Sequence, residues 1–268
     1  MENLSDKAAQ NLAAVREKKP LIHNITNYVV MNYTANALLA MGASPVMAHA
    51  VSEVEEMVSI AGALVLNIGT LAEDWIASMI KAGQKASELG TPIILDPVGS
   101  GATSLRTNSV TRIIRETSLS VIRGNPSEIL SLRHNESKTK GVDAVHSVNE
   151  AGATAKKIAE ELNTTIAITG PADFITNGER VIHVSNGHPL MARVTGTGCT
   201  ATVIIAAFSA VDDDPVSAAA TGLAFFGLAG EAAGQKASGP GSFMIEMLNA
   251  LYEITPEALK AGCKIREE

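Results

Sequence analysis

The chain has 268 residues, of which 46% are hydrophobic and 18% charged, which disfavours disorder and predicts a tightly packed globular protein of one or two domains. Its 21 Lys and Arg against 28 Asp and Glu give a net charge of −7 without a long block of like charges, which disfavours nucleic-acid binding. The two cysteines lie far apart and form no CxxC pair or Cys/His cluster, which argues against a disulfide framework or zinc site and favours the reducing cytoplasm.

The N-terminal region predicts a helix. Apolar residues recur at every third or fourth position between residues 4 and 18, and Pro20 ends the pattern. Charges occur throughout this segment and no apolar h-region is present, so we expect no signal peptide. The most lipid-like stretch, 216–230, is rich in Ala and Gly, is followed by Glu231 and falls short of the ~18–20 strongly apolar residues that a span requires. We therefore expect a buried helix there and no membrane association.

Short apolar runs without alternation recur along the chain and predict strands that are buried on both faces. These runs are 21–25, 44–48, 63–69, 92–97, 120–125 and 165–170. Helical patterns separate most of them and cover 71–89, 104–117 and 147–162. Strand–helix alternation is typical of a parallel sheet with helices on either side. The sequence therefore predicts an α/β fold, a three-layer α/β/α sandwich with a mostly parallel central sheet.

The pattern changes at residues 173–187, where two alternating runs flank the pair Asn177–Gly178. An Asn-Gly pair between such runs is a strong β-hairpin signal, so we expect an antiparallel hairpin at one edge of the sheet. Residues 201–211 and 217–233 then predict two adjacent buried helices. Because no linker, low-complexity tract or internal repeat divides the chain, we expect a single domain over residues 1–268.

Polar residues follow the predicted strands, and ligands of parallel α/β sheets bind beyond the carboxyl ends of the strands. Asp96 lies in "ILDPVGSG", and Arg123 and Glu128 lie in "VIRGNPSEI". Taken singly, the aspartate fits a cap of the next helix and the glutamate a first-turn residue that favours the dipole. Together on one rim they favour Mg²⁺, which binds few carboxylates, waters and phosphate oxygens, with the arginine fork paired to a phosphate. Other strand-end residues are His23, Asn24, Thr26, Asn27, Asn67, Gly69, Thr70 and Thr169.

The segment Gly196, Thr197, Gly198 and Cys199 precedes an apolar run of helix length. Backbone N–H groups at such a helix start can converge on an anion, and the helix dipole adds positive charge. The segment matches neither GxxxxGK[ST] nor GxGxxG, and its structural alternative is a flexible loop. The abrupt change to an apolar run favours the helix start, so we predict a phosphate cradle.

Three roles are open for Cys199. It can be an inert buried hydrophobe, or a covalent nucleophile, which requires a histidine partner that the sequence does not identify. At a helix N-terminus its pKa can also fall from about 8.5, which makes the thiol a weak base beside a phosphoryl acceptor. The histidines are His23, His49, His134, His146, His183 and His188.

Four blocks together resemble the hydroxyethylthiazole kinase family of thiamine salvage, within the ribokinase-like fold, over about residues 20–241. They are "PLIHNITNYVVMNYTANALLAMGASPVMAHAVSEVEEM", "ILDPVGSGAT", "VIRGNPSEI" and "TGTGCTATVI". The resemblance implies transfer of the γ-phosphoryl group of MgATP to the primary alcohol of 4-methyl-5-(2-hydroxyethyl)thiazole. It also implies a homotrimer whose thiazole sites lie between subunits.

The resemblance further assigns roles to individual residues. By position, Met47 and Gly196 contact the thiazole, with Asn24 and Thr26 shaping its pocket. Nucleotide and metal roles fall to other strand ends: Arg123 and Thr169 hold ATP, and Asp96 and Glu128 organise Mg²⁺ and its waters.

Cys199 stands where sugar kinases of this fold typically carry an aspartate base. We therefore expect Cys199 beside the substrate hydroxyl and the backbone amides of residues 195–199 around the transferring phosphoryl group. Two other enzymes are alternatives, a pyrimidine kinase of the same pathway and an ATP-dependent dehydratase that repairs hydrated nicotinamide nucleotides. The dehydratases carry an aspartate in their glycine motif, so Cys199 argues against them. A nucleotide- or thiazole-sensing protein without turnover is the non-enzymatic alternative.

Overall fold

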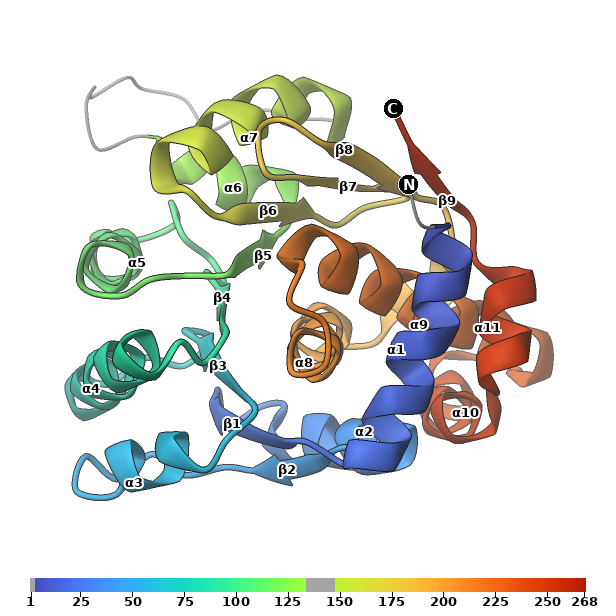
Figure 1. Ribbon diagram of the computed structural model, residues 1–268, viewed down its shortest axis with the longest axis horizontal. Coiled ribbons are helices and arrows are strands. Elements are labelled where there is room, and N and C mark those ends of the chain that lie inside the picture. The colour runs from blue at the N-terminus through green and yellow to red at the C-terminus, as the bar shows by residue number, and fades with distance from the viewer. Residues whose placement is uncertain (1–2, 134–147) are drawn as a thin grey trace.

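The computed structural model describes residues 3–133 and 148–268. A nine-stranded sheet lies between two layers of helices, in the strand order β2-β1-β3-β4-β5-β6-β7-β8-β9 (Figure 1). Strands β1 to β6 pair in parallel, whereas β7, β8 and β9 pair antiparallel. The predicted three-layer sandwich, with a mostly parallel sheet and an antiparallel edge, is confirmed.

The parallel strands form inside the predicted apolar runs. They are β1 (Leu21–Ile25), β2 (Ser44–Val46), β3 (Ala63–Asn67), β4 (Ile93–Asp96), β5 (Val121–Gly124) and β6 (Thr165–Ile168). Every residue of β3 to β6 is buried, because helices cover both faces of the central strands. Burial on both faces explains why these runs lack polar alternation.

The antiparallel edge contains the predicted hairpin of β7 (Asp173–Thr176) and β8 (Val181–Val184). Gly178 in its turn has a φ of 101°, in the left-handed region that favours glycine. A further strand, β9 (Ile265–Glu267), pairs outside β8 and makes the outermost strand at this edge. The hairpin therefore lies one strand inward from the position expected from the sequence.

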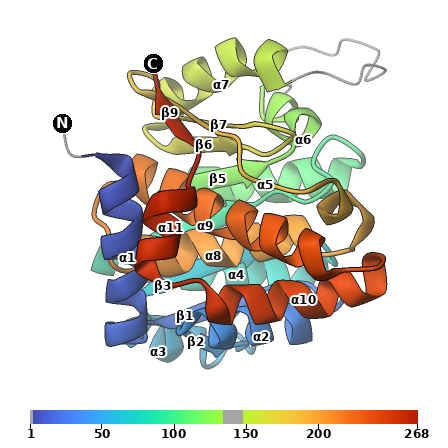
Figure 2. The ribbon, with the colours of Figure 1, turned by 90° about the vertical axis from the view of Figure 1, so that its right-hand side faces the viewer.

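Each face of the sheet has its own apolar core. Figure 2 shows the layer formed by the helices near the chain ends, and Figure 1 shows the second layer on the opposite face. The first layer comprises α1 (Leu4–Lys18), α2 (Met31–Met41), α8 (Thr197–Ser209), α9 (Pro215–Lys236), α10 (Pro240–Glu253) and α11 (Pro256–Gly262). The second comprises α3 (Val54–Ser59), α4 (Glu73–Leu89), α5 (Ser104–Glu116), α6 (Pro126–Ser131) and α7 (Val148–Leu162).

The predicted helices form at their expected places, and Ser147, the first residue of one of them, lies outside the described residues. Helix α8 begins at Thr197, a turn earlier than the predicted 201–211. Helix α9 is apolar and long enough to cross a membrane, but 83% of its most apolar window is buried inside the protein. This burial agrees with the core helix expected around 216–230.

The topology places a crevice at one end of the sheet. After β1 the chain turns to α2 on one face, whereas after the neighbouring β3 it turns to α4 on the other. Crossovers that leave adjacent parallel strands in opposite directions open a crevice at the carboxyl ends of those strands. Helix α8 packs along β1, β3 and β4, with its N-terminus at this end.

Candidate active site

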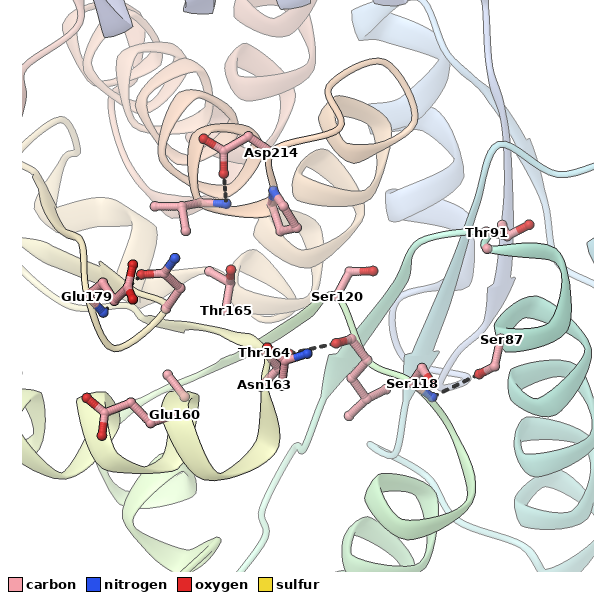
Figure 3. A pocket seen from close by; sticks show the side chains of 16 residues that line it. Ser87, Thr91, Ser118, Ser120, Glu160, Asn163, Thr164, Thr165, Glu179 and Asp214 are labelled. Carbon is pink, nitrogen blue, oxygen red and sulfur yellow. Dashed lines mark hydrogen bonds between the residues drawn. The ribbon is translucent and has the colours of Figure 1, made fainter. Parts of the chain in front are cut away.

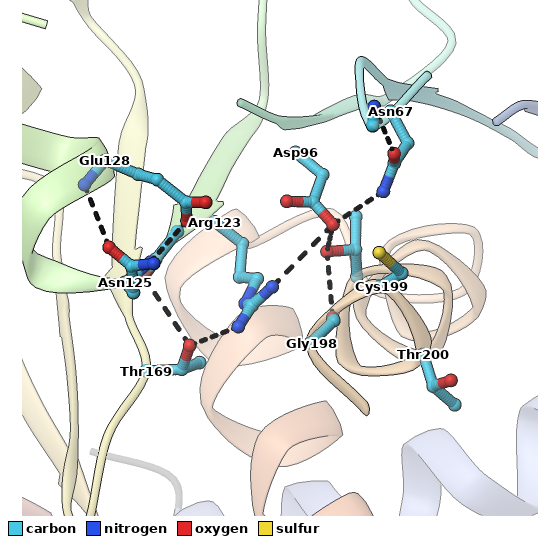
Figure 4. A network of polar contacts seen from close by, with 12 residues as sticks. Asn67, Asp96, Arg123, Asn125, Glu128, Thr169, Gly198, Cys199 and Thr200 are labelled. Carbon is cyan, nitrogen blue, oxygen red and sulfur yellow. Dashed lines mark hydrogen bonds and ion pairs between the residues drawn. The ribbon is translucent and has the colours of Figure 1, made fainter. Parts of the chain in front are cut away.

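Asp96, the last residue of β4, is the centre of a buried polar network (Figure 4). Its Oδ2 accepts hydrogen bonds from Nδ2 of Asn67 at 2.8 Å and Oγ1 of Thr202 at 2.9 Å, and lies 3.7 Å from Nη1 of Arg123. Its Oδ1 is buried and has no partner among the described residues. Burial raises the pKa of Asp96 to about 6, although the charge of Arg123 opposes the rise.

Helix α8 begins at the glycine-rich segment as predicted. Gly196 is its N-cap residue and has a φ of 80°, and a β-carbon there would lie 2.7 Å from Cγ1 of Val30. Glycine is therefore required by both conformation and space. Among the described residues no side chain caps the helix, which leaves the N–H groups of its first turn available to an anion.

Arg123 at the end of β5 lies over this helix start. A β-carbon on Gly198 would sit 2.6 Å from Nη1 and 2.8 Å from Nη2 of the guanidinium. Nη2 also donates a hydrogen bond to Oγ1 of Thr169, which directly follows β6. The structure thus brings together three predicted phosphate-binding groups, the arginine fork, the threonine hydroxyl and the helix amides (Figure 4).

Cys199 lies in the first turn of α8, with its Sγ 3.6 Å from Nδ2 of Asn27. Burial, followed by the nearby negative charge of Asp96, raises the pKa of this thiol to about 12. The lowering expected for a helix N-terminus is therefore wrong, because desolvation and a carboxylate outweigh the helix dipole. At neutral pH the group is a thiol.

The described residues give no support to a histidine-activated nucleophile. The side-chain partners found for Cys199 are Asn27, Asn67 and Asp96, and none is a histidine. His23 instead bonds the carbonyl oxygen of Ala48 through Nε2 at 2.8 Å. His134 and His146 lie outside the described residues.

Glu128 uses both carboxylate oxygens to hold backbone. Oε2 accepts from the N–H of Asn125 at 2.8 Å, and Oε1 accepts from the N–H of Gly99 at 2.9 Å. Asn125 caps the N–H of Glu128 in return, which completes a capping box at the start of α6. Glu128 therefore has the structural role of a first-turn residue at the start of α6. Its charge also lies close enough to Asp96 to raise the pKa of that carboxyl group.

The residues expected around the acceptor come from β1 and β2. Asn24 and Thr26 are buried at the end of β1, and Oδ1 of Asn24 has no partner among the described residues. Met47 is half-buried and directly follows β2 instead of lying within it. These residues therefore lie on the β1 side of the crevice, and Asp96 and Arg123 lie on the other.

The arrangement suits a divalent cation at Asp96. The described residues contain no group of three or more His, Cys, Asp or Glu side chains that could hold a metal ion. Mg²⁺ does not need such a cage, because it commonly binds through one or two carboxylates, waters and phosphate oxygens. The unpartnered Oδ1 of Asp96 is a buried oxygen of the required kind.

Comparison with known proteins identifies the family of this chain. The profile of the "Hydroxyethylthiazole kinase family" matches residues 12–257. The chain belongs to this family. A hydroxyethylthiazole kinase from Desulfotalea psychrophila is 64% identical over 100% of this chain and 98% of its own length. One from Methanococcus maripaludis is 52% identical over 98% of both chains.

Solved structures support the assignment. The structure of a hydroxyethylthiazole kinase protein from Pyrococcus horikoshii has a TM-score of 0.91 and 46% identity, covering 98% of this chain and 99% of that one. A ribokinase-like superfamily protein from Enterococcus faecalis has a TM-score of 0.63 at 14% identity, covering 92% and 89%, and this likeness concerns the fold alone. The expected membership of the hydroxyethylthiazole kinase family, with a ribokinase-like fold, is confirmed.

Sequence reasoning missed several polar residues of this family member's site. Thr202 donates a hydrogen bond to Asp96 from within the apolar run of α8. A single threonine in such a run does not indicate a site residue. Arg106 of α5 donates to the carbonyl oxygens of Ile68, Val98 and Gly69, at 3.0, 2.6 and 2.8 Å, and so ties together the loops after β3 and β4. The sequence gives no sign of these contacts, because an arginine in a predicted helix cannot be distinguished from one that is exposed to solvent.

Asp173 was expected only as the start of the hairpin. Its Oδ1 accepts the N–H of Gly170 at 3.0 Å, just beyond Thr169. Burial raises the pKa of Asp173 to about 7, and the charge of Arg123 opposes this rise. The arginine therefore interacts electrostatically with two buried carboxyl groups, Asp96 and Asp173.

A cavity of about 710 Å³ lies at the opposite end of the sheet (Figure 3). Its lining includes Ser120 and Thr165 at the amino ends of β5 and β6, and Asp214 before α9. None of the predicted site residues lines it. It is therefore separate from the polar network around Asp96.

Proposed function

We propose that this protein transfers the γ-phosphoryl group of ATP to the primary alcohol of 4-methyl-5-(2-hydroxyethyl)thiazole, a step of thiamine salvage, as a single kinase domain over residues 1–268. The observation that carries this proposal is the meeting of Arg123, Asp96 and the uncapped start of α8 beside Cys199, in a chain of this family. These groups match a phosphoryl donor on one side and an alcohol on the other.

The donor side handles phosphate charge. Arg123 and Thr169 bind phosphate oxygens, and the amides of Thr197, Gly198 and Cys199 stabilise the charge on the transferring group. Preorganised donors of this kind act on charge that develops in the transition state. Oδ1 of Asp96 would hold Mg²⁺, which would supply further charge neutralisation when bound. Glu128 would act on it through water, because both oxygens of this glutamate already bond backbone.

The acceptor side positions the alcohol. Met47 and Gly196 contact the thiazole, and Asn24 and Thr26 shape its pocket. The hydroxyl oxygen attacks the γ-phosphorus in line, the bond to the leaving oxygen breaks, and ADP departs with its electron pair. A loose transition state requires mainly positioning and charge neutralisation.

Cys199 orients the alcohol rather than deprotonating it beforehand. A thiol whose pKa is about 12 is protonated at neutral pH and has no room for a second proton. The hydroxyl proton therefore passes to an oxygen of the transferred phosphoryl group as the new bond forms. On this proposal cysteine occupies the base position of the fold without acting as a strong base.

We also propose a cytoplasmic homotrimer with acceptor sites between subunits. Tyr28 and Val29, directly after Asn27, are 68% and 63% exposed, and Leu39 on α2 and Ile245 on α10 are each 59% exposed. Exposed apolar side chains, two of them directly after the site residue Asn27, support cover by a second subunit. Both cysteines are free thiols, which supports a reducing compartment. Light scattering during size-exclusion chromatography tests the trimer.

One assay tests the reaction. The protein is incubated with MgATP and either hydroxyethylthiazole or hydroxymethylpyrimidine, and both ADP and phosphorylated product are measured. We expect phosphorylated thiazole and no phosphorylated pyrimidine. Preferential phosphorylation of the pyrimidine contradicts the assignment, and tight binding of ATP and thiazole without product favours the sensor.

A further inference from the structure

Asn67, the last residue of β3, links the two sides of the site. It pairs with Asp96 in the β3–β4 register and is almost completely buried. Its Oδ1 accepts the backbone N–H of Gly69 at 3.0 Å. A backbone N–H can only donate, so the amide has one possible orientation, with Nδ2 directed at Oδ2 of Asp96.

Asn27 continues this chain of hydrogen bonds toward Cys199. Its Oδ1 accepts the backbone N–H of Val29 at 3.1 Å, which again fixes the direction of the amide. Its Nδ2 therefore donates, to Oδ1 of Asn67 at 2.8 Å and toward Sγ of Cys199 at 3.6 Å. A directed relay thus runs from the acceptor position to the carboxylate, through Asn27 and Asn67.

The relay helps to fix where the unoccupied oxygen of Asp96 lies. Asn67 and Thr202 both donate to Oδ2, and Oδ1 is left buried without a partner. A buried carboxylate oxygen without a hydrogen bond is costly unless a ligand binds it. Partial rotation of the carboxylate would move its unoccupied oxygen away from this position, and the hydrogen bond from the amide of Asn67 opposes such rotation.

We propose that Asn67 is a positioning residue that fixes Asp96 with Oδ1 toward the phosphoryl-transfer site and couples this carboxylate, through Asn27, to the acceptor position at Cys199. The expected effect of Asn67 on turnover rests on the proposed kinase function. The expected effect of Asn67 on the local structure does not, because the relay exists in the protein without ligands.

The structural half is tested by hydrogen–deuterium exchange of the ligand-free protein, followed by mass spectrometry. Asn67→Leu removes the acceptor of both Gly69 and Asn27. We expect about tenfold faster exchange in residues 68–71 and also in 26–30, where Val29 depends on the orientation of Asn27. Unchanged exchange in 26–30 would overturn the relay.

Asn11→Leu is the matched control. Asn11 is also buried and donates from Nδ2 to a carboxylate, Oδ2 of Asp212, at 2.8 Å, but it lies on α1 away from the site. This variant loses a comparable bond and should leave exchange in residues 26–30 as in the wild type. Faster exchange there in both variants would mean that general loosening, and not the relay, is responsible, and would overturn the proposal.

The kinetic half uses Asn67→Asp, which keeps both acceptor bonds and replaces the N–H donor to Asp96 with a second carboxyl group that repels it. We expect kcat to fall by about tenfold or more and the half-saturating Mg²⁺ concentration to rise, with the KM for the thiazole within about twofold. Exchange in residues 26–30 should stay at the wild-type rate. Asn11→Asp, the corresponding change beside Asp212, should leave all three kinetic values unchanged.

The outcomes separate the two proposals. Wild-type kinetics in a folded Asn67→Asp variant would overturn the positioning role. A wild-type protein that phosphorylates no thiazole overturns the proposed function, and the exchange measurements on Asn67→Leu still decide whether the relay is present.

Discussion

Arg123 and Gly198 occupy neighbouring volumes so closely that a β-carbon on Gly198 would lie 2.6 Å from Nη1 of the arginine. Real β-carbons do not approach other heavy atoms so closely, so the glycine is what allows the guanidinium to reach the first turn of α8. Gly198 thus leaves room for the side chain of Arg123, whereas Gly196 allows the left-handed backbone conformation at the helix start.

Gly198→Ala should lower activity more than stability. The atoms it displaces are the far end of a flexible side chain, so the fold accommodates the methyl group while the arginine fork moves off the phosphate position. We expect kcat/KM for ATP to fall by about tenfold or more, the range for a misplaced positioning group. The measurement is steady-state kinetics with a thermal melt.

Gly241→Ala is the control for this change. A β-carbon at Gly241, in the first turn of α10, meets nothing within 4 Å. Its kinetics should match the wild type. Unchanged ATP kinetics in Gly198→Ala would contradict the placement of Arg123 at the transferred phosphate.

Cys199→Asp should retain substantial kcat. The variant supplies a carboxylate, which is a better proton acceptor than a thiol whose pKa is about 12. Steady-state turnover with hydroxyethylthiazole checks this expectation, with Cys263→Ala as a control outside the site. A complete loss of turnover in a folded Cys199→Asp protein would favour a role specific to the thiol.

Asp96→Asn should stabilise the protein while it abolishes catalysis. The folded pKa of Asp96 lies near 6 against an ordinary 3.8, so the penalty for ionising this buried group grows from about pH 3.8 and is complete above about pH 6. The difference corresponds to about 3 kcal/mol at pH 8, fading as pH falls from 6 toward 3.8, where both folded and unfolded wild type become protonated.

Urea unfolding of the metal-free wild type and Asp96→Asn at pH 8 and pH 5 measures this effect. The free energy of unfolding of the variant should exceed that of the wild type at pH 8, by less at pH 5. An equal or lower stability at pH 8 would mean that the bonds from Asn67 and Thr202 already compensate the burial of the charge.

Glu128→Gln should reduce kcat and raise the Mg²⁺ requirement, with little effect on the KM for the thiazole. Glutamine keeps an acceptor for only one of the two backbone N–H groups and removes the charge beside Asp96. The damaged capping box should cost about 1 kcal/mol of stability. Initial rates across a Mg²⁺ series give the answer.

Glu257→Gln provides the comparison for this prediction, because Glu257 is also a first-turn glutamate, in α11, but is remote from the site. Its kinetics should equal those of the wild type. Should Glu128→Gln turn over at the wild-type rate at every Mg²⁺ concentration, Glu128 has no part in the metal site.

The sequence predicted the parallel core well because its strands are buried on both faces and therefore read as continuous apolar runs. Strand β9 was missed because three residues at the C-terminus, Ile265–Glu267, pair with β8 only through the tertiary fold. Helices α10 and α11 were not assigned either.

Convergence of the site was predictable because carboxyl ends of parallel strands share one edge of a sheet. Asp96, Arg123 and Thr169 each follow or end such a strand. The pKa of Cys199 was not predictable, since it depends on its burial and on Asp96. For Glu128 the sequence allowed two roles, a helix-start residue and a metal ligand, because both use a glutamate. It could not show that both carboxylate oxygens bind backbone N–H groups.

On the proposed roles, the two sides that the polar relay connects come from separate parts of the chain. Acceptor residues come from β1 and β2, within the first fifty positions, whereas donor residues come from β4 to β6. Only Asn67 and the start of α8 serve both. On the proposed roles, a change of acceptor would involve this N-terminal stretch and the start of α8, whereas the donor residues of β4 to β6 could stay unchanged.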